Sequence, residues 1–319
     1  MSHLNGKILA AGIISILTVS TAAVVFPLIT IADPSMKGGW RIQLTFIGFF
    51  CIALSRLRSN SNKYIDFLQT KKLRTLLSGL SLSLYFCFWC ASLDLTSTAH
   101  SLLISCSSPI FLIAFYLITG RSVKKSEILG TILAFSGILL ICTNYELTEK
   151  VTFLGDFLAF LSAIFVTMHF YLSEKLYDLG DYCYLSLVYF FGSFFCICFS
   201  MLFNFYKVGP SGLLVFLNNF DYLTHSEGFY VLHLGIFTGV LSGVLFYYFL
   251  SKASAFHCSV LLLFEPILGT FYSYILNFHP YISLYTWIGG LLVLLGNILA
   301  NIYSKLPSPN TEPLLPITN

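Results

Sequence analysis

Two stretches of this chain match each other: STAHSLLISCSSPIF at residues 97–111 and SAFHCSVLLLFEPIL at residues 254–268. They align without gaps, and a short slip in the following loop extends the match. The aligned pairs are His100 with His257, Pro109 with Pro266, Gly130 with Gly289, and Gly137 with Gly296. Chance similarity between apolar segments of low complexity is the alternative. The coincidence of serine, histidine, proline and glycine positions favours an internal repeat.

The matched stretches belong to a chain that is apolar almost from end to end. Hydrophobic residues make up 57% of the 319 residues and charged residues 10%, against about 25% charged in soluble domains; the mean hydropathy is +0.83. About 20 apolar residues cross a bilayer as a helix. We therefore predict ten spans, near residues 8–31, 42–55, 75–93, 98–119, 128–144, 151–173, 184–206, 229–251, 257–277 and 284–303. These runs are continuous rather than alternating, which disfavours the strands of a membrane barrel.

The repeat and the number of spans together predict the architecture. A looser match of Gly6 with Gly155 starts each half, so each half carries five helices. An odd number of spans inserts the second half upside down, as in the inverted repeats of secondary transporters. We expect an all-α membrane protein of ten transmembrane helices, with repeats at residues 1–150 and 151–305 and a disordered cytoplasmic tail at 306–319.

The positions of lysine and arginine predict the orientation, because basic loops resist translocation. With both termini in the cytoplasm, thirteen of the 17 basic residues lie inside, and the four outside are Lys37, Arg41, Lys150 and Lys207. The first span is too long and too uniformly apolar for a cleaved signal peptide, so we expect it to remain as a helix. The sequence thus predicts a multi-pass protein of the cell (inner) membrane. Its formal charge of +3 reflects this topology and gives no reason to expect nucleic acid.

Two short motifs have chemical associations that their surroundings do not support. Cys87 and Cys90 form a CxxC pair, but it lies in an apolar run without a second ligand pair, so packing is the better account. The string GPSG at residues 209–212 matches the GxSG of rhomboid-type intramembrane proteases, yet it falls in an outer loop rather than at the start of a buried helix. We expect no cofactor and no metal site.

Glu265 is the one charge that we expect deep within a span. A carboxylate at the bilayer centre costs on the order of 2.5–3.5 kcal/mol, so it needs a partner, a proton or water. Glu265 is either a neutral side chain hydrogen-bonded between helices or a substrate or proton site. Pro109 and Pro266 lie about ten residues into their helices, where each proline removes an amide donor. Such a break lines a cavity, or it is a kink set by packing.

Other polar and aromatic residues are candidates for the substrate path. Arg41, beside Trp40 at the outer end of the second span, is an interfacial anchor or captures an anionic group. The serines of the first matched stretch line the path or let helices approach closely: Ser101, Ser105, Ser107 and Ser108. The aromatic residues of the third and eighth spans form an ordinary stripe or a stacking box for a planar or cationic solute: Tyr85, Phe86, Trp89, Tyr247 and Tyr248. Three histidines are packing residues or a proton relay: His100, His169 and His257.

The segments that carry the repeat resemble a known family. LTSTAHSLLISCSSPIFLIAFYLITG with ILGTILAFSGILLI, and ASAFHCSVLLLFEPILGTFYSYIL with WIGGLLVLLGNILA, look like the EamA-type ten-helix branch of the drug/metabolite transporter superfamily. Glu265–Pro266 is similar to its acidic-proline pair, and Trp40–Arg41 resembles the arginine that opens its second helix. Two positions depart from the pattern, because Arg121 stands where the family usually has Glu, and Asn277 and His279 stand where it often repeats an acid. No acidic residue is therefore available for coupling at those two places.

The resemblance implies secondary transport of a small metabolite, along a path formed mainly by the third, fourth, eighth and ninth spans. No GxxxxGK[ST] loop occurs, which favours exchange, proton coupling or facilitation. Some bacterial members resemble S-adenosylmethionine carriers, so we expect exchange of S-adenosylmethionine for S-adenosylhomocysteine. Proton-coupled export of amino acids or drugs and metabolites is the alternative. An intramembrane enzyme or a scaffold is a further class; absence of HExxH and of paired intramembrane aspartates counts against the enzyme. The expected partners are a small-molecule substrate and the lipid bilayer, with a homodimer left open.

Overall fold

The computed structural model of the chain describes residues 6–96, 98–120, 122–143, 152–174, 182–211, 226–253, 255–276 and 284–302. These residues are almost entirely helical and form no strand. Their helices make up ten membrane-crossing segments, as the hydropathy predicted, and six of these are long and apolar enough to cross a membrane by themselves. The prediction of an all-α membrane protein with ten transmembrane helices is confirmed.

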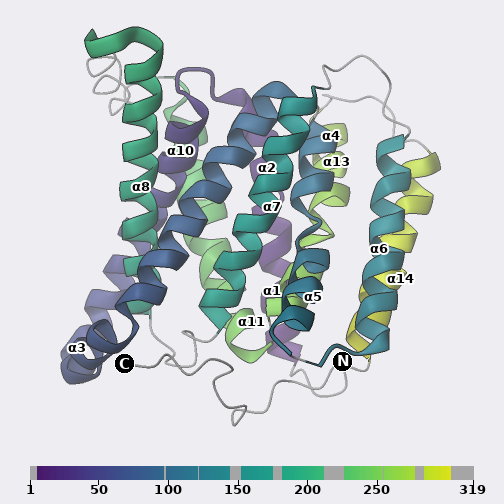
Figure 1. Cartoon of the computed structure of the whole chain (residues 1–319), viewed down its shortest axis with the longest axis horizontal. Helices are drawn as coiled ribbons and strands as arrows, with labels where there is room; N and C mark the ends of the chain where they lie inside the picture. The colour runs from purple at the N-terminus through teal and green to yellow at the C-terminus, as the bar shows by residue number, and fades with distance from the viewer. Residues whose placement is uncertain are drawn as a thin grey trace.

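Each half of the chain contributes five of these segments. The first half consists of α1 (Gly6–Val19) with α2 (Ala22–Val25) and η1 (Phe26–Leu28), the two spans of α3 (Pro34–Leu95), α4 (Thr98–Ser105) with α5 (Ser108–Ile118), and α6 (Lys125–Thr143). The second half consists of α7 (Phe153–Glu174), α8 (Tyr182–Val208) with η3 (Gly209–Ser211), α10 (Gly228–Leu232) with η4 (His233–Leu241) and α11 (Ser242–Lys252), α12 (Ala255–Leu262) with α13 (Glu265–Ile275), and α14 (Leu284–Ile302). The start of α1 and the end of α14 lie at the same end of the bundle (Figure 1).

Helix α3 holds two spans, Pro34–Ser55 and Lys71–Leu95, that fold back on each other. The beginning of the first span and the end of the second meet where Lys37 Nζ lies 3.1 Å from Asp94 Oδ1. The helix begins earlier than expected because Asp33 caps it, accepting a hydrogen bond from the backbone N–H of Met36 at 3.1 Å. Proline follows at the first position, where its missing N–H has no helical partner to lose.

Helices α6 and α14 pack through the glycines that the repeat aligned. A Cβ atom on Gly137 would lie 2.5 Å from the carbonyl oxygen of Gly289, and one on Gly296 would lie 2.6 Å from the carbonyl oxygen of Gly130. The repeat aligns Gly137 with Gly296 and Gly289 with Gly130. If each residue of the first contact is replaced by its aligned partner, the second contact results. The two helices are therefore related by a local twofold relation, run antiparallel (Figure 1), and represent the inverted repeat directly.

The widened segment η4 is a π-helix, and its Gly235 and Gly239 pack against the first span of α3. Gly243, the second residue of α11, continues this contact at the same four-residue spacing. Any Cβ at these positions would meet a side chain of α3, as Gly235 lies against Leu44, Gly239 against Thr45 and Gly243 against Phe49. Small residues let the two backbones approach closely. The contact joins the two halves of the chain.

Candidate functional site

Both matched stretches form helices that are broken in the middle. Helix α4 ends at Ser105 and α5 begins at Ser108, while α12 ends at Leu262 and α13 begins at Glu265. Pro109 and Pro266 lie in the first turns of α5 and α13, where a proline disturbs no helical hydrogen bond. Ser108 and Glu265 are aligned by the repeat, so the two halves place a hydroxyl and a carboxyl group at equivalent points.

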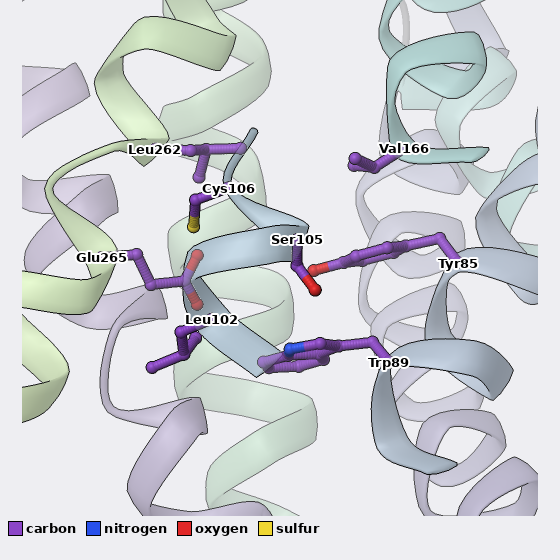
Figure 2. Close-up of a pocket in the computed structure, with 8 residues that line it drawn as sticks. All are labelled: Tyr85, Trp89, Leu102, Ser105, Cys106, Val166, Leu262 and Glu265. Carbon is purple, nitrogen blue, oxygen red and sulfur yellow. The ribbon is translucent and has the colours of Figure 1, made fainter. Parts of the chain in front are cut away.

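A small cavity lies beside these breaks (Figure 2). It is lined by residues of both halves: Tyr85, Trp89, Leu102, Ser105, Cys106, Val166, Leu262 and Glu265. The volume of the cavity is about 10 Å³, which is room for one water molecule. The lining comes from α3, α4 and the turn after it, α7, α12 and α13; α11, which belongs to the eighth span of the expected path, contributes none of it.

Glu265 reaches into this cavity from the first residue of α13 (Figure 2). The side chain is 6% exposed, and within the described residues its carboxylate accepts no hydrogen bond and joins no salt bridge. A buried charge without a partner is costly. The carboxylate therefore needs a proton, a water molecule or a cation that enters the cavity.

Tyr85 and Trp89 face Glu265 from the second span of α3 (Figure 2). Their rings are nearly parallel, at 9°, with centroids 5.9 Å apart. Phe26 meets the edge of Trp89 at a centroid distance of 5.3 Å and holds the indole in place. Aromatic faces attract cations and stack on planar groups.

Arg41 lies inside the helix bundle rather than on its surface, which does not fit an anchor that contacts lipid head groups. Its side chain is buried, and Nη2 donates a hydrogen bond to the carbonyl oxygen of Thr238 in η4 at 3.3 Å. The earlier start of α3 explains the burial, because it places Arg41 inside the helix rather than in a loop. Lys37 is buried for the same reason. Glu265 is therefore not the one deep charge of the chain, although Arg41 does not line the cavity.

The four candidate serines of the first stretch are buried but have different surroundings: Ser101, Ser105, Ser107 and Ser108. Ser105 lines the cavity, and its Oγ lies 2.8 Å from Oγ of Ser162 in α7. Ser108 does not line the cavity. Its hydroxyl has no hydrogen-bond partner among the described residues, while its carbonyl oxygen accepts a hydrogen bond from Thr167 Oγ1 at 3.4 Å. Ser107 bonds the backbone of Ile104 instead. The structure thus brings only Ser105 to the cavity.

The two tyrosines of α11 lie away from the cavity. Tyr247 is buried, and its hydroxyl lies 2.8 Å from Nε2 of His169, whose Nδ1 lies 2.9 Å from Oγ of Ser78. Tyr248 is 40% exposed on the outer surface of the bundle. The aromatic residues of the third and eighth spans therefore do not enclose one box. Sequence reasoning also missed Leu102, Cys106, Val166 and Leu262, whose apolar character gives no signal in an apolar chain.

The remaining motifs form no site among the described residues. Cys87 and Cys90 are buried free thiols, and no group of three potential metal ligands occurs in the described part of the chain. Gly209 to Ser211 form a short 3-10 turn after α8 rather than the start of a buried helix. The side chains of His100 and His257, and all of Arg121, Asn277 and His279, lie outside the described residues.

Ten membrane-crossing segments, a repeat of opposite orientation and a small cavity beside two broken helices are the arrangement of a multi-pass membrane transporter. The chain belongs to the EamA-like transporter family, whose model matches residues 7–143 and again residues 153–302. No curated protein matches the chain.

The fold also occurs among solved structures. One, named only as the crystal structure of a protein, is similar to this chain over 94% of its length and over 98% of the other chain, with a TM-score of 0.66 and 16% sequence identity. At 16% sequence identity, this similarity shows a shared fold and is no evidence of a shared function.

Proposed function

We propose that the chain is a secondary transporter whose substrate binds between Glu265 and the Tyr85–Trp89 pair. One observation carries this proposal: a buried carboxylate without a protein partner and two parallel aromatic rings line the same cavity, which lies between the two halves. A positively charged group compensates the carboxylate, and a planar group stacks on the rings. The substrate class is therefore a small organic cation or zwitterion with a planar part.

Exchange of S-adenosylmethionine for S-adenosylhomocysteine fits this class. The sulfonium or ammonium group pairs with Glu265, and the adenine stacks on the rings. Because the two compounds share the adenosine and the amino-acid head group, one site accepts either of them from opposite sides of the membrane.

Proton-coupled export of an amino acid or another metabolite is the second candidate. It is favoured by the same carboxylate, because an unpaired intramembrane Glu265 can carry a proton when no substrate is bound. In both mechanisms the cavity has to enlarge, since ligand sites have volumes of about 300–1,000 Å³. A rocking motion of one half against the other would provide this space.

Counterflow in proteoliposomes tests the proposal. Vesicles preloaded with unlabelled S-adenosylhomocysteine should accelerate uptake of labelled S-adenosylmethionine, and excess amino acids should compete weakly. Acceleration by an imposed pH gradient, with amino acids as the transported species, would favour the second candidate instead. Vesicles that contain folded protein and show neither effect would contradict both.

A further inference from the structure

The indole N–H of Trp89 is a buried donor without an acceptor. The side chain is 1% exposed, and Nε1 donates no hydrogen bond to any described residue. Buried donors are nearly always paired, because an unpaired one loses its bond to water and gains nothing in return. Since Trp89 lines the cavity, its partner belongs to whatever occupies that space.

No other lining group supplies the missing acceptor. Leu102, Val166 and Leu262 are apolar, and the hydroxyl of Ser105 is engaged with Ser162. The remaining lining groups, the Tyr85 hydroxyl and the Cys106 sulfur, accept no hydrogen bond from the indole N–H. The carboxylate of Glu265 lies on the opposite side of the cavity and is not bonded to the indole (Figure 2). The cavity thus presents a donor on one wall and an acceptor on the other, and one water molecule has room between them in this structure.

The charges around the cavity favour an occupant without net charge in its head group. Arg41 and Glu265 are both buried and have opposite formal charges. Lys37 is already paired with Asp94. A head group that carries both an ammonium and a carboxylate leaves this balance unchanged, whereas an amine alone adds a buried positive charge.

We infer that Trp89 Nε1–H is the donor that recognises a carboxylate oxygen of the substrate, so that the site selects zwitterions over the corresponding amines. This assignment rests on the proposed substrate site: Glu265 takes the cationic group, and Trp89 takes the carboxylate. Trp89 is then a specificity-determining residue as well as a stacking surface.

Two matched pairs of probes test the assignment, each made of a carboxylate-bearing compound and its decarboxylated counterpart. They are S-adenosylmethionine with decarboxylated S-adenosylmethionine, and L-tryptophan with tryptamine. Dissociation constants are measured on the full-length purified chain by thermal shift, and the ratio within each pair is compared. A hydrogen bond to a charged group predicts that wild-type protein prefers the carboxylate-bearing member by about 10- to 100-fold in at least one pair.

Trp89→Phe keeps one aromatic ring but removes the pyrrole ring with its N–H, so the preference should fall to about threefold or less. Trp40→Phe makes the same change at an equally buried tryptophan of α3 outside the cavity, and it should keep the wild-type ratio. Because each ratio is taken within one protein sample, partial loss of folded protein does not change it.

Several outcomes would overturn the assignment. They are equal binding of both members by wild-type protein, a preference that survives Trp89→Phe, a preference that Trp40→Phe also abolishes, or no binding of any probe. Failure of the transport proposal looks different: the binding preference and its loss in Trp89→Phe would persist while counterflow is absent.

Discussion

The Cζ atom of Arg41 lies 4.9 Å from the ring centroid of Phe86, so a buried cation joins the two spans of α3. Phe26 adds a second ring at 5.8 Å. Lysine lacks the planar group that stacks on such rings. We therefore predict that Arg41→Lys lowers the free energy of unfolding by about 1–3 kcal/mol. Thermal unfolding of the purified protein in detergent measures the loss.

Lys207 provides the comparison for Arg41. Its Nζ atom lies 4.6 Å from the ring centroid of Phe203, but the pair is exposed near the end of α8. Exposed pairs contribute about 0.5–1 kcal/mol or less, so Lys207→Gln should have a small effect. Equal losses in the two variants would contradict the special role of the buried pair.

Substitution of Glu265 should separate transport from folding. Glu265→Gln keeps the shape of the side chain but can neither pair with a cation nor carry a proton. We expect flux to fall at least about tenfold, while the melting temperature stays near that of wild type. Flux is measured in vesicles with matched amounts of folded protein. Wild-type flux in this variant would assign Glu265 a structural role.

The glycine contacts of α6 and α14 predict strong position dependence. A Cβ on Gly296 would lie 2.5 Å from the backbone nitrogen of Ala134, so Gly296→Ala should destabilise the protein by about 1–3 kcal/mol. Gly290 on the same helix has no atom closer than 3.9 Å to such a Cβ, and Gly290→Ala should be nearly neutral. The melting temperatures of the two variants test this difference. Indistinguishable values would contradict the close contact of Gly296 with α6.

A pH-sensitive contact joins the two halves at the end of the bundle opposite the start of α1 (Figure 1). Glu227 accepts hydrogen bonds from the backbone N–H and hydroxyl of Thr30, each at 2.7 Å, and from the N–H of Ile31 at 3.2 Å. Burial raises the pKa of Glu227, but these hydrogen bonds and the charge of Lys37 lower it more, so the net pKa lies below 4.5. The contact therefore stabilises the protein at neutral pH, and this contribution is lost as the pH falls through the lowered pKa.

Comparison of wild type with Glu227→Gln measures that contribution. Because the carboxylate is largely exposed, we expect an advantage of at most about 1 kcal/mol for wild type at pH 7. The advantage should shrink as the pH is lowered below 4.5. A difference in melting temperature that does not change with pH would rule out the ionised carboxylate as its cause.

Orientation in the membrane is tested by reporter fusions. Lys71, Lys72, Arg74, Lys124, Lys125 and Lys252 lie at the end of the bundle where α1 starts, whereas Asp33, Asp94, Asp156 and Glu227 lie at the other end. Basic ends face the cytoplasm. Fusions at Lys63 and Asp221 should therefore report opposite compartments, with Lys63 inside. Reporters on the same side would contradict the number of spans.

The spans were predictable because the bilayer imposes one dominant requirement, about 20 apolar residues per helix. The start of α3 could not be predicted from hydropathy, because its first turns contain polar residues and glycines: Lys37, Gly38, Gly39 and Arg41. The Asp33–Pro34 pair was the available signal, because an N-cap acid followed by proline is typical of a helix start.

The candidate site was predictable only where chemistry contrasts with the apolar background. Glu265 and the two prolines stand out from this background. Of the other predicted site residues, Tyr85, Trp89 and Ser105 line the same cavity as Glu265. Tyr247 and Tyr248 show the limit. Neighbouring residues point about 100° apart on a helix, so at most one of them faces a given partner. Their flanking sequence is apolar on every side, and only packing determines which one is buried.

The small volume of the cavity, about 10 Å³, affects the affinities that can be measured. A substrate binds only chains whose helices have moved apart, so the apparent dissociation constant equals the intrinsic one divided by the fraction of chains in the open form. Modest affinity would then report how rare that form is, not how poorly Glu265 and the rings hold the substrate. Lipids or detergents that change this fraction will change the affinity without altering a single contact in the site.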